Sequence, residues 1–403
     1  MYNWKKEDFI RLASGQNLGK KYNVFMDRVY LDWAATAPAD IEIQRTALET
    51  SFVYPGNPSS VHTEGKRARQ KLEELRAELA GMLNWPTGGI CFTSGGTESN
   101  NIIIYSMLRK KGRIKILSSG IEHPSISESL KAYPSGDIRF LSSMKDGMVS
   151  PVSLENELKG TKLLTVMYTN NEIGTVQDIN GIASLKAPGT HFHCDIVQAL
   201  GKVPLRLDGI DSASISAHKL GGPKGCGLLL FRNGFEPLYK GGGQESGIRP
   251  GTESIFNAMC MMETVRKALD GLHESIAHGK YIKRYLLEEL KKTEGVSLIP
   301  DGDVEELLSD KYSPFILRCS IPPLPGEVIV RMMDDNGISV STGSACSSRK
   351  KGRNEVLSVI GIDEKTAESS IRISWGRSTR LADVQYLIKV LRDKILPAAA
   401  VIR

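Results

Sequence analysis

The chain has 403 residues, 40% of them hydrophobic and 24% charged, with a formal net charge of +6; this ordinary globular composition excludes wholesale disorder. The charge is spread along the chain and no apolar run approaches the roughly 20 residues of a membrane span, so the sequence indicates neither a nucleic-acid-binding nor a membrane protein. The chain begins with polar and charged residues where a signal peptide needs an apolar segment, and we expect a cytoplasmic protein.

Strands and helices are predicted to alternate from residue 29 onward. Val29–Pro38 is typical of a short strand and a turn, and residues 62–84 carry apolar side chains at helical spacing. Seven short β-rich runs are predicted as strands: Ile90–Thr93, Ile114–Ser118, Ile138–Leu141, Leu163–Tyr168, His191–Cys194, Ala213–Ser216 and Gly227–Phe231. Helical or loop stretches separate these runs, so the pattern predicts α/β layering with a largely parallel sheet.

The pattern changes after residue 254. Residues 254–292 are predicted to form one or two long helices. The block that follows has predicted strands at Ser313–Ser320 and Ser369–Ser374 and predicted helices at Gly326–Asp335 and Ala382–Ile395, which is typical of a smaller α+β domain. The predicted organisation is an N-terminal segment (1–28) packing with the small domain, a large domain (29–273) and a small C-terminal domain (274–403).

Two motifs follow predicted strands directly. Ile215–Gly227 (ISAHKLGGPKGCG) places Lys219 at a strand end before a glycine-rich turn, where a lysine could form a Schiff base with an aldehyde cofactor or could simply be a surface lysine. Thr93–Asn101 (TSGGTESNN) begins a helix whose N–H groups could bind a phosphate, or which could be a plain capped helix. Neither G-x-G-x-x-G nor G-x-x-x-x-G-K-[ST] occurs, which weakens the dinucleotide and P-loop interpretations.

A third motif supplies a carboxylate. His193–Lys202 (HCDIVQALGK) puts Asp195 at the end of another predicted strand, with Gln198 shortly after it. A carboxylate there could keep a cofactor ring nitrogen protonated, or could be an ordinary helix N-cap. A Schiff-base lysine, a helix N-terminus that binds phosphate and a strand-end aspartate are together the groups needed to hold pyridoxal 5′-phosphate (PLP).

One of the six cysteines has an unusual context. Cys346 lies in Ser341–Ser348 (STGSACSS), with basic residues just after it. Positive charge nearby favours the nucleophilic thiolate, and the polar stretch that follows could carry the thiol into and out of a site. The other cysteines lie in or beside apolar runs and are predicted to be structural and reduced: Cys91, Cys194, Cys226, Cys260 and Cys319. No C-x-x-C pair or histidine at ligand spacing indicates a metal site.

The chain resembles the NifS/IscS-like cysteine desulfurases of the class V aminotransferase group, within the fold-type I PLP enzymes. Besides the motifs above, the resemblance rests on these segments: YLDWAATAP near residue 30, GNPSSVH (56–62), EHPS (122–125), NNEIGTVQD (170–178), GGGQESGIRPGTES (241–254) and SSIRISWGRST (369–379). It implies a fold-type I PLP-dependent transferase, with a mostly parallel seven-stranded sheet in the large domain and a smaller α+β domain carrying the Cys346 loop.

The resemblance also implies a role for individual residues. Lys219 would hold PLP and move the substrate Cα proton, His123 would stack on the ring and assist proton transfers, and Cys346 would accept the sulfur. The implied PLP-binding residues are Gly96, Thr97, His123, Asn171, Asp195, Gln198, Ser216, His218, Lys219 and Thr252. Asn171 and Arg372 would bind the substrate carboxylate.

The implied reaction converts L-cysteine to L-alanine and leaves a persulfide on Cys346, whose sulfur passes to an acceptor such as an iron–sulfur scaffold or a tRNA- or cofactor-thiolation enzyme. In this family the threonine at the position of Thr252 reaches the phosphate of the neighbouring subunit, which implies a homodimer. The alternatives are a selenocysteine lyase, another class V aminotransferase, or a catalytically silent scaffold. Two departures from the family pattern are Trp33 and Ala217.

Overall fold

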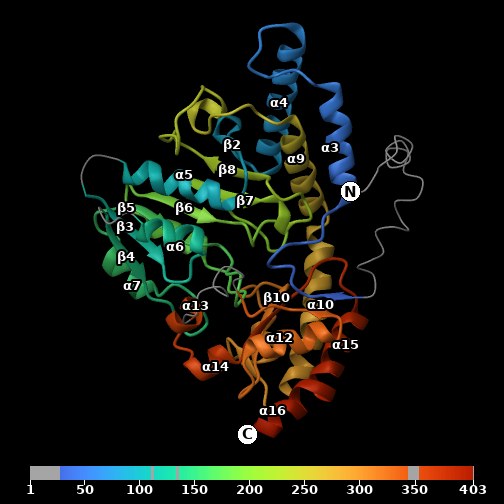
Figure 1. Ribbon diagram of the computed structural model, residues 1–403. Coiled ribbons are helices and arrows are strands. Elements are labelled where there is room, and N and C mark those ends of the chain that lie inside the picture. Colours follow the sequence, from blue (N-terminus) through green and yellow to red (C-terminus); the bar gives the residue numbers. More distant parts are fainter. Residues whose placement is uncertain (1–27, 110–112, 133–135, 344–353, 403) are drawn as a thin grey trace, which may run out of the picture.

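The computed structural model describes residues 28–109, 113–132, 136–343 and 354–402. Figure 1 shows a larger body built on a central sheet and a smaller body below it, with α9 (Ile255–Asp270) and α10 (Leu272–Lys291) in one column that runs from the larger body into the smaller one. These helices occupy the region predicted to form one or two long helices, and Gly271 separates them. None of the helices within these ranges is long and apolar enough to cross a membrane.

The larger body contains a seven-stranded sheet in the order β2-β8-β7-β6-β5-β3-β4. Its strands are β2 (Ile90–Thr93), β3 (Lys115–Ser119), β4 (Asp137–Leu141), β5 (Thr161–Thr165), β6 (His191–Asp195), β7 (Ser212–Ser216) and β8 (Gly227–Phe231). Strand β8 runs antiparallel to both neighbours, and the other adjacent strands run parallel. This confirms the predicted α/β fold with a mostly parallel seven-stranded sheet.

Helices cover both faces of this sheet. They are α3 (Ile41–Val53), α4 (Thr63–Met82), α5 (Gly96–Leu108), α6 (Pro124–Lys131), α7 (Pro151–Glu157), α8 (Ile179–Leu185) and α9. On one face, α3, α4 and α9 share a hydrophobic core with residues such as Ile215 and Leu228. On the other, α5 and α6 pack through Ile103 and Ile126 against Leu229. Because both faces are buried, a central strand such as β8 (GLLLF) forms a short, continuous apolar run.

The smaller body has its own hydrophobic core around a three-stranded antiparallel sheet in the order β12-β10-β9. Its elements are α10, β9 (Ser297–Ile299), α11 (Val304–Leu307), β10 (Ile316–Ser320), α12 (Gly326–Asp335), β11 (Ile338–Ser339), α13 (Glu355–Val359), α14 (Glu364–Glu368), β12 (Ser370–Ser374), α15 (Leu381–Val390) and α16 (Leu396–Ile402). The predicted helix over 382–395 is therefore α15 with a π-helical turn over Leu391–Ile395.

The first described residues pack against the smaller body. Strand β1 (Val29–Tyr30) pairs in parallel with β11, and Leu31 is fully buried in the smaller body's core. These residues therefore pack with the C-terminal elements, whereas our division assigned them to the large domain. Residues 1–27 lie outside the described ranges, so the prediction for the N-terminal segment remains a prediction.

Candidate active site

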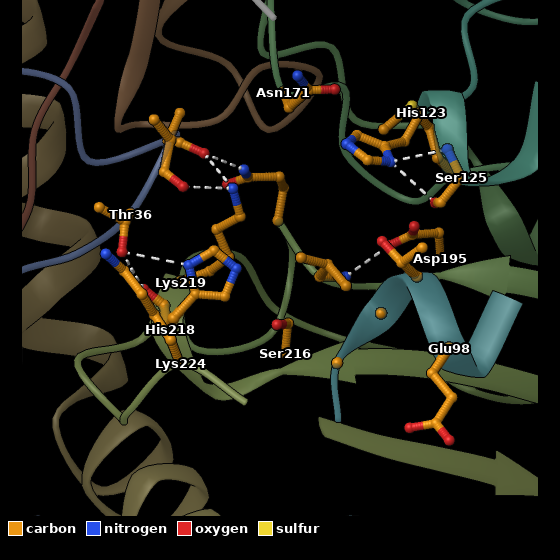
Figure 2. A pocket seen from close by; sticks show the side chains of 18 of the residues that line it. Thr36, Glu98, His123, Ser125, Asn171, Asp195, Ser216, His218, Lys219 and Lys224 are labelled. Atoms are coloured by element: carbon orange, nitrogen blue, oxygen red, sulfur yellow. Dashed lines mark hydrogen bonds between the residues drawn. The ribbon is translucent and has the colours of Figure 1, made fainter. Parts of the chain in front are cut away.

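A cavity of about 540 Å³ lies beyond the carboxyl ends of the sheet strands. Asp195 ends β6 and Ser216 ends β7, while His123 follows β3. Ligands in parallel α/β sheets bind at this edge. All but two of the predicted site residues line the cavity: Gly96, Thr97, His123, Asn171, Asp195, Gln198, Ser216, His218, Lys219 and Arg372. Figure 2 shows Lys219 and His218 on one side of the cavity and His123 and Asp195 on the other.

Lys219 stands on a short 3₁₀ turn that follows β7 directly. Its Nζ donates to the carbonyl oxygens of Ala34 and Ala35, at 2.8 and 2.7 Å. The glycines after it are required by packing: a Cβ on Gly222 would lie 2.3 Å from Thr264 Oγ1 on α9, and Gly221 has a φ of +91°. The glycine-rich turn thus lets the chain pass close to α9 while Lys219 faces the cavity.

The start of α5 forms an open anion site. Its N-cap is Gly95, which supplies no side-chain cap, and Gly96 and Thr97 line the cavity. The unpaired N–H groups and the helix dipole at such an end favour a phosphate. A Cβ on Gly96 would lie 2.8 Å from Val197 Cγ2, so the close approach of the two loops requires glycine there.

His218 completes this side of the cavity. Its Nδ1 lies 3.2 Å from Thr36 Oγ1. Burial, followed by the positive charges of Lys219, Lys202 and Lys224, lowers the pKa of His218 to about 4. His218 is therefore a neutral hydrogen-bonding partner near neutral pH rather than a cation.

Asp195 is held by a chain of buried polar groups. Its Oδ1 accepts from the Val197 N–H at 2.9 Å, and its Oδ2 accepts from Asn100 Nδ2 at 2.8 Å. His193 Nε2 lies 2.9 Å from Asn100 Oδ1, and its Nδ1 lies 2.8 Å from Ser212 Oγ. Burial, with the nearby His191, lowers the pKa of His193 to about 3, so the ring is neutral. The Asp195 carboxylate can only accept, so the Asn100 amide directs its NH2 group to Asp195 and its oxygen to His193 Nε2, which donates.

His123 is the N-cap of α6, where its Nδ1 accepts from the Ser125 N–H at 3.1 Å. Burial lowers its pKa, so the ring facing the cavity is neutral near pH 7. The adjacent Glu122 is also buried, and its Oε1 accepts from Ser119 Oγ and the Met167 N–H, both at 2.7 Å. Burial raises the pKa of Glu122 to about 8, so this carboxyl is largely protonated at neutral pH.

The structure brings Arg372 and Asn171 together, but through the Asn171 main chain. Arg372 Nη1 donates to the Asn171 carbonyl oxygen at 2.9 Å, and Nη2 forms an ion pair with Asp32 Oδ1 at 2.7 Å. The Nε atom of Arg372 is buried without a hydrogen-bond partner. Arg372 also lines the cavity, and a guanidinium group is suited to binding a carboxylate.

Gln198 lies between two chain segments at the cavity wall. Its Nε2 donates to the Ala34 carbonyl oxygen at 2.8 Å, and its Oε1 accepts from Lys202 Nζ at 2.7 Å. Burial, followed by the charges of Lys219 and Arg372, lowers the pKa of Lys202 to about 7. The second Nε2 hydrogen of Gln198 is the one that a ligand in the cavity could use.

Two predicted site residues are not among the lining residues. Thr252 is exposed in the segment before α9, and Cys346 lies outside the described residues. Sequence reasoning missed Asn100, Lys202 and Asp32, although all three lie inside motifs that it singled out. The cavity offers a lysine amine, an open helix N-terminus and a fixed carboxylate, and this donor set fits PLP.

Comparison with known proteins identifies the family. The pattern of the "Aminotransferase class-V" family matches residues 29–387. "Cysteine desulfurase IscS" of Dictyoglomus turgidum is 36% identical over 377 residues, covering 90% of this chain and 93% of that protein. An "IscS-like cysteine desulfurase" of Mycobacterium tuberculosis is 34% identical over 389 residues, covering 92% and 96%. A solved "NifS-like protein" superposes with a TM-score of 0.82 at 30% identity, covering 91% and 99%. The chain therefore belongs to the class-V aminotransferase family and, within it, to the PLP-dependent NifS/IscS-like cysteine desulfurases.

Proposed function

We propose that the chain converts L-cysteine to L-alanine with PLP as cofactor and leaves the sulfur on Cys346 for transfer to an acceptor protein. The single observation that carries the proposal is the meeting, in one cavity, of the Lys219 amine, the fixed Asp195 carboxylate and the open N-terminus of α5. Kinship with cysteine desulfurases supports cysteine as the substrate.

When bound, PLP supplies an electron sink that stabilises negative charge at the substrate Cα. The Lys219 amine would hold the cofactor and move the Cα proton. Asp195, fixed by Asn100 and by a backbone N–H, would keep the ring nitrogen protonated. The phosphate would bind at Gly96 and Thr97, with support from the side chains of Ser216 and His218.

The remaining lining residues are proposed to orient the ring and the substrate. His123 is a neutral imidazole at the cavity wall, suited to stacking and to passing a proton. Gln198 would donate its second amide hydrogen to the ring hydroxyl. Arg372 and Asn171, which both line the cavity, would bind the substrate carboxylate.

The sulfur step needs a thiolate. The Cys346 thiolate would attack the substrate sulfur, so that an S–S bond forms as the substrate C–S bond breaks. The electron pair of the C–S bond stays with the carbon fragment, which takes up a proton and leaves as alanine. No external oxidant is required, because the sulfur is transferred rather than oxidised by a third species.

The proposal includes a cytoplasmic homodimer that delivers sulfur to an iron–sulfur scaffold or a thiolation enzyme. Thr252 is exposed and does not line the cavity of its own chain, which supports a role at a neighbouring subunit's phosphate. The five described cysteines are free thiols, which is typical of a reducing compartment. No observation favours selenocysteine as the substrate.

Labelled L-cysteine tests the proposal directly. The PLP-loaded enzyme is mixed with the ³⁴S-labelled substrate, and the thiol that gains sulfur is identified by peptide mass spectrometry. We expect a persulfide on Cys346 in the parent and in Ser348→Ala, and none in Cys346→Ser, which should keep its PLP absorbance. Parental sulfur output from Cys346→Ser would refute the nucleophile.

A further inference from the structure

A buried ion pair lies beside the cavity and is not part of the predicted site. Arg318 Nη1 is 3.1 Å from Glu172 Oε2, and the two side chains are 1% and 7% exposed. Arg318 lies on β10 of the smaller body, and Glu172 lies in the loop of the larger body next to Asn171. Arg318 and Arg372 face each other across β10 and β12, so neighbouring arginines of one sheet hold adjacent residues of one loop.

Both flanks of the cysteine-bearing segment, residues 344–353, are attached to this ion pair. On the leading flank, Arg318 Nη2 donates to the Thr342 carbonyl oxygen at 2.7 Å. On the trailing flank, Asn354 Nδ2 donates to Glu172 Oε2 at 2.7 Å. One carboxylate oxygen therefore accepts from both Arg318 and Asn354, and it joins the two ends of the segment next to the cavity.

Gly343 shows how closely the leading flank passes over the ion pair. Its φ is +132°, and an added Cβ would lie 2.9 Å from both Arg318 Nη1 and Glu172 Oε2. A side chain there would therefore have to push apart the two buried charges. This contact accounts for the glycine of the STGSACSS motif.

We propose that Glu172 is a positioning residue for sulfur transfer, because through Arg318 and Asn354 it fixes both ends of the cysteine-bearing segment beside the cavity. The inference rests on the proposed function, in which Cys346 accepts the sulfur. Attack of one sulfur on another depends on holding the two reactants together, and a misplacement of about 1 Å can cost roughly 100-fold in rate. The steps at the substrate Cα are proposed for Lys219 and Asp195, whereas the Glu172 carboxylate accepts hydrogen bonds from Arg318 and Asn354.

Two substitutions test the clamp, which is the Glu172 carboxylate with its two donors Arg318 and Asn354, while leaving the rest of the fold intact. Glu172→Gln removes the charge and presents an amide group where two donors now converge. Asn354→Ser keeps an N-cap for α13, since Asn354 Oδ1 now accepts from the Leu357 N–H, but serine is too short to reach Glu172. The matched control is Asp363→Ser, the same kind of N-cap change at the start of α14, away from the ion pair.

The measurement compares two steps in PLP-loaded enzyme. Exchange of the substrate Cα hydrogen with solvent deuterium reports the Lys219 step, and single-turnover mass spectrometry reports persulfide on Cys346. We expect Asn354→Ser, which keeps the Glu172 charge that acts on His123, to exchange at the parental rate, while persulfide formation falls by about tenfold or more in both variants. Asp363→Ser should match the parent in both.

Three results would overturn the proposal. Persulfide formation within about twofold of the parent in both variants would show that the clamp does not matter. An equal fall in exchange and persulfide formation would indicate a general structural role instead. A parent enzyme that exchanges the Cα hydrogen but forms no persulfide on Cys346 would refute the proposed function, and the positioning role with it.

Discussion

The substitution Asn100→Asp tests the buried contact that fixes Asp195. Asn100 Nδ2 lies 2.8 Å from Asp195 Oδ2, and Asn100 is fully buried. The substitution keeps the shape and the Oδ1 acceptor for His193, but it replaces the donor by a second carboxylate oxygen. Two carboxylates at this separation cannot both ionise at ordinary cost, so the pair must share one proton.

The magnitude follows from the lost bond and the retained proton. A hydrogen bond to a charged group contributes about 1.5–3 kcal/mol, which sets the expected loss of stability at the acid end of the range, near pH 4. In the unfolded chain both carboxyls ionise near pH 4, whereas the folded pair keeps one proton to higher pH. Because the folded state then binds more protons, the free energy of unfolding relative to the parent falls by about 1.4 kcal/mol per pH unit from about pH 4 upward, until the pair ionises fully.

The assay is urea unfolding of the parent and the variant at several pH values between about 5 and 8, together with the pH dependence of cysteine turnover. The matched control is Asn101→Asp, the same substitution one residue later, where the amide contacts the Thr97 carbonyl oxygen rather than a carboxylate. We expect a pH-dependent loss in Asn100→Asp alone, with turnover falling as the shared proton weakens the charge on Asp195. Equal stability and pH profiles in the two variants would refute the contact.

Two further perturbations address the scaffold and the dimer. The Arg76 guanidinium donates to both Glu245 carboxylate oxygens at 3.0 Å, so Arg76→Met leaves a buried carboxylate without its partner and should lower the free energy of unfolding in urea by about 3–5 kcal/mol. The double variant Arg76→Met/Glu245→Gln should recover part of this loss. Full additivity of the two substitutions would contradict the pairing. If Thr252 serves the neighbouring subunit, a heterodimer of one Lys219→Ala chain and one Thr252→Ala chain contains one intact site. Mixing the two impaired homodimers should therefore restore cysteine turnover. A confirmed heterodimer whose turnover is no higher than that of the homodimers would contradict the shared site.

Much of the fold could be predicted because its strands are buried on both faces. Leu228–Leu230 in β8 and the apolar run in β5 are covered by helices on each side, so they read as short, continuous apolar segments. Strands β9 and β11 were missed because they span only Ser297–Ile299 and Ile338–Ser339, too short for a periodicity to show. Pairing of β1 with β11 joins residues about 310 apart in the chain, which local patterns do not contain.

The residues of the candidate site likewise fall into those that local sequence patterns indicate and those that only tertiary contacts bring together. Lys219 and Asp195 stand at strand ends next to glycine-rich or polar turns, and such local signals are visible in a sequence. Their partners are set by tertiary contacts: Asn100 meets Asp195 across 95 residues, and Asp32 meets Arg372 across 340. The clamp at Glu172 is of this second kind, since its carboxylate joins Arg318 on one sheet to Asn354 before α13.

Chemical trapping of the cofactor tests the central claim most directly. Reduction of the PLP-loaded protein with borohydride, followed by peptide mapping, identifies the amine that carries the pyridoxyl group. The account predicts the label on Lys219, the lysine that faces the cavity from the end of β7. A label on Lys224, which lines the same cavity, or on Lys202, or no label on any lysine, would contradict it.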